Sequence, residues 1–393
     1  GGDGLAAYLS LPQAPDASAL RRALAGHHAP VVAVAYADAD GGGLQMAGYV
    51  PLRELPSGLV PVPARNPAYD WSARIPFAAL PRRRLGRETP LVVAADGLLP
   101  PGRISGVEYL WRSGERQRRI ERRLGRAHRS GPLELADLVA LQRDVGSAGP
   151  ELVERALRLA GPTSALGREA RQIASLLEAW DGRAAAESVG ASAYAVFELR
   201  LLRALLEPVL GEELLARYLG LSRMRPLPLL VEILRRAEEE GGEATERAAS
   251  RVRRSLRDAW IHLSVELGAN RARWTWGRLH PLRFSPLLPG KGSRDGFGPF
   301  AYGGDSSSVR VGAYRPLEPF ATALVSTYRF AADAGDLDQA LTALAPGQSE
   351  HAGHVHAGDG LERWLEGRPS LLSNSDPVIE DAEVRRLGLV PAG

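Results

Sequence analysis

Cysteine is missing from all 393 residues of the chain. Its absence excludes disulfides, thiolate metal sites and a cysteine nucleophile, but it does not fix the cellular compartment. Lysine is almost as scarce, because Lys291 is the only one and arginine carries the rest of the basic charge. The net charge is only +3, so the pI of about 9.3 reflects arginine content rather than a strong positive field.

Long hydrophobic runs are also missing. No apolar stretch reaches the roughly 18 residues that a membrane-spanning helix needs, so the sequence predicts no membrane span. The chain starts at Gly1 without a methionine or a signal-like segment, and such a boundary says little about targeting. Hydrophobic residues make up 45% and charged residues 24%, which is ordinary for a globular protein.

Arginine is concentrated at Arg82–Arg84 and again between Arg116 and Arg123. One interpretation is a patch that binds phosphate groups or nucleic acid. The other is a solvated surface in an arginine-rich protein. The second is favoured, because no aromatic residues are interleaved and no nucleic-acid-binding motif accompanies the clusters. We therefore expect no nucleic-acid partner.

Residues 5–90 have the pattern of short strands joined by turns. Val31–Tyr36 is a continuous apolar run, which is typical of a buried strand. Asp38–Gly43 follows it and predicts a hairpin-type turn. Asp38 and Asp40 are candidate calcium ligands, but the favoured interpretation is that their side chains form the turn itself.

The middle of the chain, from residue 150 to residue 265, is predicted to be mainly helical. Apolar residues recur there at helical spacing, and glycine-containing pairs separate the periodic segments. These segments are 152–160, 165–180, 193–210, 227–240 and 246–267. Upstream, the sequence predicts a strand at 91–97 and helices at 111–128 and 133–144. Residues 272–345 return to strand character.

The C-terminal segment carries the most specific pattern in the chain. Pro346-Gly347-Gln348-Ser349 forms a turn motif, His356 follows it, and Trp364 stands three residues before Gly367. This combination resembles the C-terminal end of the penicillin acylase (penicillin amidase) family. The family pattern there is a GQSG-like turn, a His-Tyr pair and a W-x-x-G step.

Other motifs follow the order of that family along most of the chain. They are Y-A-D from Tyr36, G-x-x-P-x-R from Gly48, Q-x-D from Gln142, W-D-G from Trp180, W-G-x-x-H from Trp276, G-G-D from Gly303 and a T-x-R strand from Thr327. Each motif is weak alone, but their joint order and spacing identify the chain as a member of the family. The resemblance covers the C-terminal part of the family's β-chain.

The resemblance implies an α+β fold: part of the αββα sandwich of N-terminal-nucleophile hydrolases, with a large helical insertion. We expect residues 1–110 to form the first β-rich part of the sandwich and residues 111–267 to be mainly helical. Residues 268–393 are then the returning strands and the C-terminal segment of the same sandwich.

The catalytic parts agree less well with the family than the scaffold does. The family's β-chain begins with a serine whose own α-amino group is the base for its hydroxyl, whereas this chain begins with Gly1. Ala95 and Asp96 stand in place of the oxyanion Asn pair. Alanine has no donor and an ionised aspartate only accepts, and losing one donor typically reduces the rate by about 10²–10³. Arg116 matches the family arginine that orients the nucleophile region, whereas His280 matches a position interpreted as structural.

No cofactor is predicted. The family's calcium site takes an aspartate from a stretch that here is Arg103–Gly106, which has no carboxylate. A zinc site is an alternative elsewhere, because a glycine-rich loop contains ligand types at suitable spacing. They are His351, His354, His356 and Asp359. The resemblance accounts for one of these histidines without a metal, so the favoured prediction is no metal.

Two functions remain open on the sequence. The resemblance implies hydrolysis of linear C–N bonds in acyl amides with a hydrophobic acyl group, such as β-lactam side chains, N-acyl-homoserine lactones or lipopeptides. The alternative is a catalytically inactive family member that serves as a binding or partner subunit. Ala95, Asp96 and the lack of the N-terminal serine motivate it.

A partner is expected on either hypothesis, because a sandwich that begins after its first strands leaves sheet edges unpaired. The expected partner is a missing N-terminal portion or α-chain, or a second copy in a homo-oligomer. A small acyl amide is the expected ligand. The family implies a periplasmic or secreted bacterial protein.

Overall fold

The computed structural model describes most of the chain, which divides into two compact units. The described residues are 4–38, 41–52, 54–55, 61–86, 91, 93, 95, 114–221, 226–286, 296–349, 351 and 353–375. Unit 1 comprises residues 1–137, 331–340 and 371–393, and unit 2 comprises residues 138–330 and 341–370. The boundaries predicted at residues 110 and 267 stay a prediction. None of the helices in the described part of the chain combines the length and the apolarity that crossing a membrane requires.

Unit 1 opens with helices, so the prediction of strands from residue 5 onward is wrong at its start. The first two elements are α1 (Gly4–Ser10) and α2 (Ala17–Leu24). Asp16 begins α2, because its side chain accepts a hydrogen bond from the backbone N–H of Ala19 at 2.6 Å. The residues that follow are alanine, leucine and arginine, which favour helix once the cap is made.

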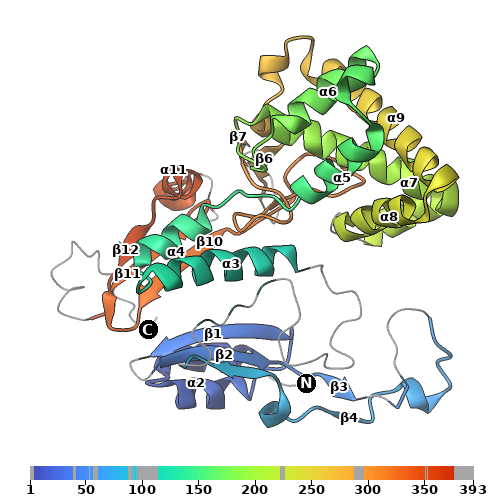
Figure 1. Cartoon of the computed structure of the whole chain (residues 1–393). Helices are drawn as coiled ribbons and strands as arrows, with labels where there is room; N and C mark the ends of the chain where they lie inside the picture. The colour runs from blue at the N-terminus through green and yellow to red at the C-terminus, as the bar shows by residue number, and fades with distance from the viewer. Residues whose placement is uncertain are drawn as a thin grey trace. The chain divides into compact units, whose positions relative to one another are not determined.

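A small antiparallel sheet of unit 1 has the strand order β1-β2-β5 (blue in Figure 1). Its strands are β1 (Val32–Asp38), β2 (Gly41–Ala47) and β5 (Arg82–Arg84). The strand predicted at 31–36 is confirmed as β1. It is not fully buried, because its side chains alternate between half-buried and exposed, whereas all but the first residue of β2 are buried. The alternation means that β1 presents only one face to other residues of the unit.

The turn predicted at 38–43 is shorter than expected. Asp38 pairs with the first residue of β2, so the glycines of this stretch belong to the strand. A Cβ on Gly42 would lie 2.8 Å from a carbonyl oxygen of β1, and glycine permits this close approach. The Asp38 carboxylate accepts a hydrogen bond from the backbone N–H of Ala17 at 2.9 Å. Asp40 lies outside the described residues.

Short strands and turns follow in the chain, and two helices come after them. The two-stranded ribbon of β3 (Pro51–Leu52) and β4 (Ala73–Arg74) is followed by a 3₁₀ turn at Phe77–Ala79. The strand predicted at 91–97 is described only at residues 91, 93 and 95. These three residues are not in a strand and pair with no described strand. The helices predicted at 111–128 and 133–144 are confirmed as α3 (Glu115–Ser130) and α4 (Leu135–Gln142).

The predicted helical region is confirmed and forms most of unit 2. Its helices are α5 (Pro150–Ala160), α6 (Arg168–Glu178), α7 (Val189–Leu221), α8 (Leu227–Glu240) and α9 (Gly242–Leu267). Figure 1 shows them gathered in one bundle, green to yellow, with α9 packed against each of the others. α7 contains a kink at Gly211, where φ is 72°, shortly after Pro208.

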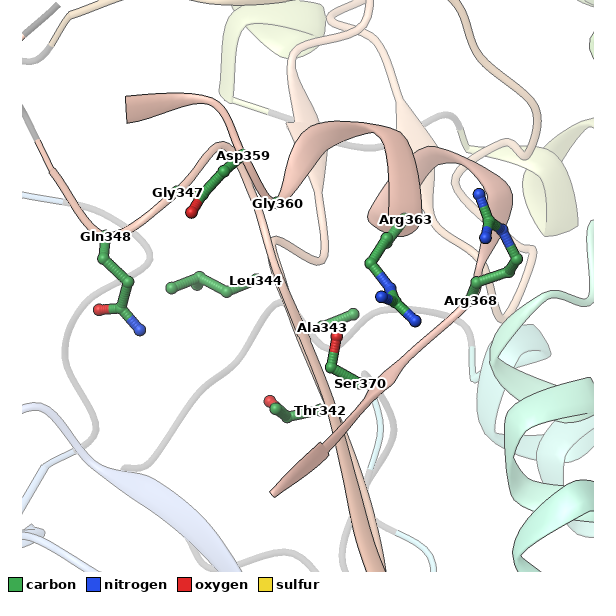
Figure 2. A pocket seen from close by; sticks show the side chains of 10 residues that line it. All are labelled: Thr342, Ala343, Leu344, Gly347, Gln348, Asp359, Gly360, Arg363, Arg368 and Ser370. Carbon is green, nitrogen blue, oxygen red and sulfur yellow. The ribbon is translucent and has the colours of Figure 1, made fainter. Parts of the chain in front are cut away.

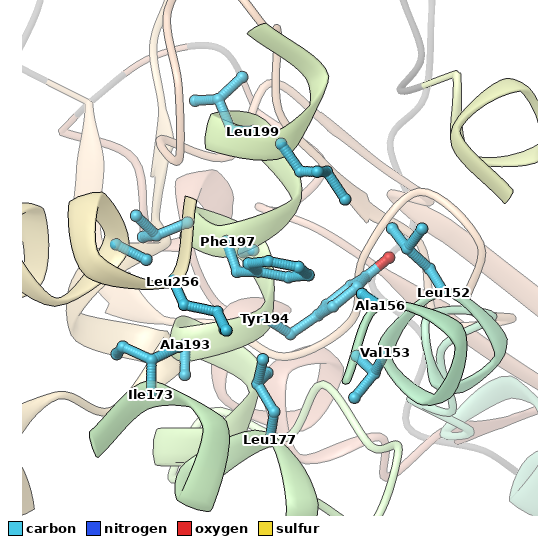
Figure 3. Close-up of a cluster of buried hydrophobic side chains, with 14 of the residues drawn as sticks. Leu152, Val153, Ala156, Ile173, Leu177, Ala193, Tyr194, Phe197, Leu199 and Leu256 are labelled. Carbon is cyan, nitrogen blue, oxygen red and sulfur yellow. The ribbon is translucent and has the colours of Figure 1, made fainter. Parts of the chain in front are cut away.

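The core of this bundle is apolar and continuous. Figure 3 shows side chains from α5, α6, α7 and α9 converging on one cluster. Those labelled there are Leu152, Val153, Ala156, Ile173, Leu177, Ala193, Tyr194, Phe197, Leu199 and Leu256. Fully burying one large apolar side chain stabilises a fold by roughly 1.5–3 kcal/mol, so helix packing explains why this region keeps its predicted form.

The strands after the bundle are short and pair locally. β6 (Pro281–Phe284) pairs with β7 (Phe297–Ala301), and β8 (Gly312–Ala313) pairs with β9 (Leu324–Val325). A three-stranded sheet has the order β10-β11-β12. Its members are β10 (Tyr328–Asp333), β11 (Asp336–Leu344) and β12 (Ser370–Leu372). The short helices α10 (Trp276–Leu279) and α11 (Leu361–Glu366) complete the described structure.

Two valines of α9 test the energetics of the bundle. Val252 is fully buried, whereas Val265 is 77% exposed. We expect Val252→Ala to lower the free energy of unfolding by about 2–3 kcal/mol, because it removes buried methyl groups and leaves a cavity. The matched change Val265→Ala should stay within about 0.5 kcal/mol. Denaturant unfolding measures both, and equal effects would show that α9 does not pack as described.

Candidate functional site

The Trp364 side chain of α11 is fully buried and is the centre of the C-terminal motif. Its ring stacks on Tyr302 with 5.4 Å between ring centroids, and its Nε1 donates to the carbonyl of Ser326 at 3.1 Å. The Arg329 guanidinium lies 4.6 Å above the Trp364 ring and donates to the Trp364 carbonyl at 2.8 Å. The W-x-x-G step and the T-x-R strand are therefore parts of one packed cluster.

Arg310 makes the same two kinds of contact: it lies over an aromatic ring and donates to a carbonyl of α11, that of the residue after Trp364. Its guanidinium carbon lies 4.6 Å from the Tyr302 ring centroid, and Nη2 donates to the Leu365 carbonyl at 2.8 Å. The last carbonyls of a helix have no partner within the helix, and cationic donors both satisfy them and complement the helix dipole. Burial lowers the pKa of Arg329 below its ordinary value, and Tyr302 opposes that shift. An arginine nevertheless stays protonated in proteins.

The Gly347–Ser349 turn folds back onto the loop before α11. The Ser349 N–H donates to the carbonyl of His356 at 3.0 Å. A Cβ on Gly347 would collide with the backbone carbonyl oxygen of His356, so this position has no room for a side chain. The glycine of the family motif is thus explained by close approach of the backbone.

A small pocket lies beside this turn, between β11, β12 and α11. Figure 2 shows the Arg363 side chain pointing from α11 toward Ser370, with Gln348 at the other end of the pocket. The volume is about 190 Å³, below the roughly 300 Å³ at which small-molecule sites begin. A second arginine in the lining, Arg368, already pairs with Glu366. The pocket is therefore assigned no ligand.

The histidines of this loop do not assemble the alternative zinc site. His356 is paired with Asp359, with 2.6 Å between Nδ1 and Oδ2. His354 accepts a hydrogen bond from the backbone N–H of His356 through Nδ1 at 3.2 Å. Across the described part of the chain, no group of three His, Cys, Asp or Glu side chains is placed to hold a metal ion.

Asp305 of the G-G-D motif is a buried carboxylate, only 3% exposed. Oδ2 accepts from the Ser147 hydroxyl at 2.6 Å. Oδ1 accepts from the backbone N–H groups of Ser307 and Ser308 at 2.8 and 3.0 Å, and from their hydroxyls at the same two distances. A buried carboxylate must be hydrogen-bonded in this way to offset its lost hydration. The motif therefore joins two segments of unit 2 that are far apart in sequence.

His280 and Trp276 are also buried inside unit 2. Their rings stack with 4.2 Å between centroids, and Trp276 Nε1 donates to the Gly304 carbonyl at 3.0 Å. His280 Nδ1 is hydrogen-bonded to the carbonyl of Phe320. The histidine is fully buried. These contacts give the W-G-x-x-H motif a packing role, in line with the structural interpretation of His280.

The residues matched to the family's catalytic machinery lie in unit 1. Ala95 is half-buried in a bend, and Asp96 lies outside the described residues. Arg116 is half-buried in the first turn of α3. The stretch Arg103–Gly106, considered for calcium, is likewise outside the described residues. The roles of Ala95, Asp96 and Arg116 at an active site stay a prediction.

The fold is that of a known class. The chain is similar to a solved structure of a thermostable penicillin G acylase from Alcaligenes faecalis, with a TM-score of 0.67 and 18% sequence identity. The match covers 99% of this chain and 73% of that one. The likeness shows the fold, which is the α+β sandwich of N-terminal-nucleophile hydrolases predicted from the sequence.

The family follows from the sequence comparison. The family model of penicillin amidase matches residues 1–380, and the chain belongs to this family. Acyl-homoserine lactone acylase QuiP of Pseudomonas aeruginosa is 27% identical over 91% of this chain and 46% of its own length. Penicillin acylase 2 proenzyme of Pseudomonas sp. is 26% identical over 87% of this chain and 44% of its own. The chain thus spans a little under half the length of these curated relatives.

Sequence reasoning missed several residues that hold the motifs together. Ser147 and Arg310 bind partners that are 158 and 55 residues away in sequence, so no local pattern indicates them. Ser307 was detectable, because an aspartate followed by serines commonly forms a side-chain-stabilised turn.

The Asp305 network predicts a large effect of a small change. Asp305→Asn should lower the free energy of unfolding by about 2–4 kcal/mol, because the amide NH₂ replaces one acceptor and faces hydroxyl and N–H donors. The control is Asp333→Asn, since that exposed side chain accepts one hydrogen bond, from Gly335 at 2.8 Å. It should cost under about 1 kcal/mol. Thermal and denaturant unfolding would contradict the assignment if the two variants were equally stable.

Proposed function

We propose that this chain is part of an acylase that hydrolyses the linear C–N bond of acyl amides. The observation that carries the proposal is the match to the penicillin amidase family over residues 1–380. The fold likeness to a penicillin G acylase supports it, because the scaffold of such an enzyme is present.

The substrates proposed first are N-acyl-homoserine lactones. Acyl-homoserine lactone acylases of Pseudomonas aeruginosa and Pseudomonas putida are 27% and 25% identical to this chain over most of its length. β-Lactam side-chain amides are the second class, supported by the 26% identity to penicillin acylase 2 proenzyme. Both classes have an amide bond flanked by an apolar acyl group, so one mechanism serves either.

In this proposal the nucleophile is a serine outside the printed residues, with its own α-amino group as base. It attacks the amide carbonyl, the amine leaves, and water then hydrolyses the acyl-enzyme ester. Arg116 orients the region around the nucleophile. Ala95 supplies no side-chain donor to the oxyanion, so stabilisation of that charge falls to the remaining donors.

A catalytically inactive binding subunit is the second candidate. The observation that favours it is the alanine at position 95, where the resemblance expects an amide donor. An oxyanion donor is worth about 10²–10³ in rate, so relaxed selection for chemistry is consistent with its loss.

The test uses the protein produced from its complete gene. Short-chain and long-chain N-acyl-homoserine lactones and penicillin G are supplied, and the free amine released is measured. Intact mass and N-terminal sequencing are recorded on the same sample. Amine release from a protein of two chains, the larger beginning with serine, is the expected result. A single unprocessed chain that releases no amine from any substrate would contradict the proposal and would favour the second candidate, a catalytically inactive binding subunit.

The Ala95 assignment predicts a gain of activity. If Ala95 occupies the oxyanion position, Ala95→Asn should raise kcat by about tenfold to a hundredfold with little change in KM, because the new donor acts on transition-state charge. The control is Ala35→Asn on the exposed side of β1, which should leave kcat unchanged. An unchanged kcat in a folded Ala95→Asn enzyme would remove Ala95 from the site.

A further inference from the structure

Unit 1 contains a cavity that neither the family motifs nor the proposed function explains. Its volume is about 350 Å³, which is within the range of small-molecule sites. The lining includes His27, Tyr49, Arg74, Ile75 and Phe77. No acidic side chain is among the lining residues, so the charge of the cavity comes from Arg74.

Arg74 presents a cation to this cavity. Its guanidinium carbon lies 4.0 Å from the centroid of the Tyr49 ring, a cation–π contact that orients the planar group. The Tyr49 ring also packs on His28, with 4.1 Å between ring centroids. Within the described part of the chain, Arg74 forms no ion pair with a carboxylate. Its N–H edge is therefore available to bind an anion, and a carboxylate fits it in the bidentate mode.

His27 adds a buried acceptor. The side chain is only 2% exposed, and its Nε2 lies 2.6 Å from the carbonyl oxygen of Pro30. A carbonyl only accepts, so Nε2 carries the proton and Nδ1 of the neutral ring is an acceptor. Nδ1 is buried and has no hydrogen-bond partner among the described residues. Buried polar atoms are normally satisfied, so this nitrogen favours a ligand with an N–H or O–H donor.

The apolar part of the lining is supported by the core of unit 1. Ile75 and Phe77 pack against a buried cluster that contains Leu44, Val50 and Leu80. The Ile75 N–H also donates to the Val50 carbonyl at 2.8 Å. Because this wall is held by the core of the unit, it is formed before any ligand arrives, which reduces the entropic cost of binding.

We propose that this cavity binds a small carboxylic acid that has an apolar body and a hydroxyl or amide N–H beside the carboxylate. The carboxylate pairs with Arg74, the neighbouring donor bonds to His27 Nδ1, and the body packs on Ile75 and Phe77. Hydroxy acids and N-acylated amino acids belong to this class. The proposal does not depend on amide hydrolysis.

Calorimetric titration of the full chain tests the ligand class. The probe is mandelate, which has a carboxylate, an adjacent hydroxyl and a phenyl group. Phenylacetate lacks the hydroxyl, and methyl mandelate lacks the charge. Mandelate should saturate the protein with a Kd of about 1 mM or lower, and each comparator should bind at least about tenfold more weakly. The ligand class is wrong if mandelate shows no saturation up to about 10 mM, or if all three compounds bind equally.

Matched variants place the binding in this cavity. Arg74→Gln should raise the Kd for mandelate at least about tenfold, and Arg74→Lys should give an intermediate Kd, because lysine keeps the charge but not the planar donor edge. The control Arg84→Gln removes the same charge from an exposed position of unit 1 outside the lining, and its Kd should match that of the unaltered chain. Both arginines are exposed, so the variants are expected to fold. Equal affinity in the Arg74→Gln and Arg84→Gln proteins would overturn the site.

Discussion

The burial of Trp364 is the constraint on which the C-terminal half of unit 2 depends. Its ring is enclosed by Tyr302 and Arg329, and its own carbonyl accepts from the same arginine. Arg310 satisfies the next carbonyl. The Trp364 ring thus packs against one arginine from a distant segment, and the carbonyls at the end of its helix bind that arginine and Arg310. Removing the Trp364 side chain would take the ring away from the Arg329 guanidinium and leave a large cavity in the core, and truncating a buried tryptophan typically costs about 3–5 kcal/mol.

The family motifs around Asp305 and Trp276 are explained by packing within unit 2. Two motifs shared with the penicillin amidase family make contacts inside the fold. Asp305 accepts hydrogen bonds from hydroxyl and backbone N–H groups, and Trp276 stacks on His280. None of them needs to touch a substrate. Ala95 and Arg116, which the resemblance matches to the family's catalytic machinery, lie in unit 1 instead, and their roles stay a prediction.

Unit 1 also combines a pre-formed apolar wall with one buried nitrogen, His27 Nδ1, that has no hydrogen-bond partner among the described residues. Val50 fixes the backbone at Ile75, and that packing leaves Arg74 and His27 facing a cavity. A buried acceptor without a donor is a cost to the folded state unless something else meets it. The same logic that explains the satisfied Asp305 carboxylate therefore points to a ligand at His27.

The sequence by itself determined the helices of unit 2, because apolar periodicity reports directly on a face that must be buried. It also determined the family and fold, because many weak motifs occur in one order. It did not show that the first residues are helical. It also did not show that the glycines near Gly42 belong to a strand, because that assignment depends on pairing with β1 and on a close approach of the two backbones. Only the tertiary structure decided which partners Asp305, Arg310 and Arg74 meet. Those contacts join residues that are far apart in the sequence, and only the folded backbone brings them together.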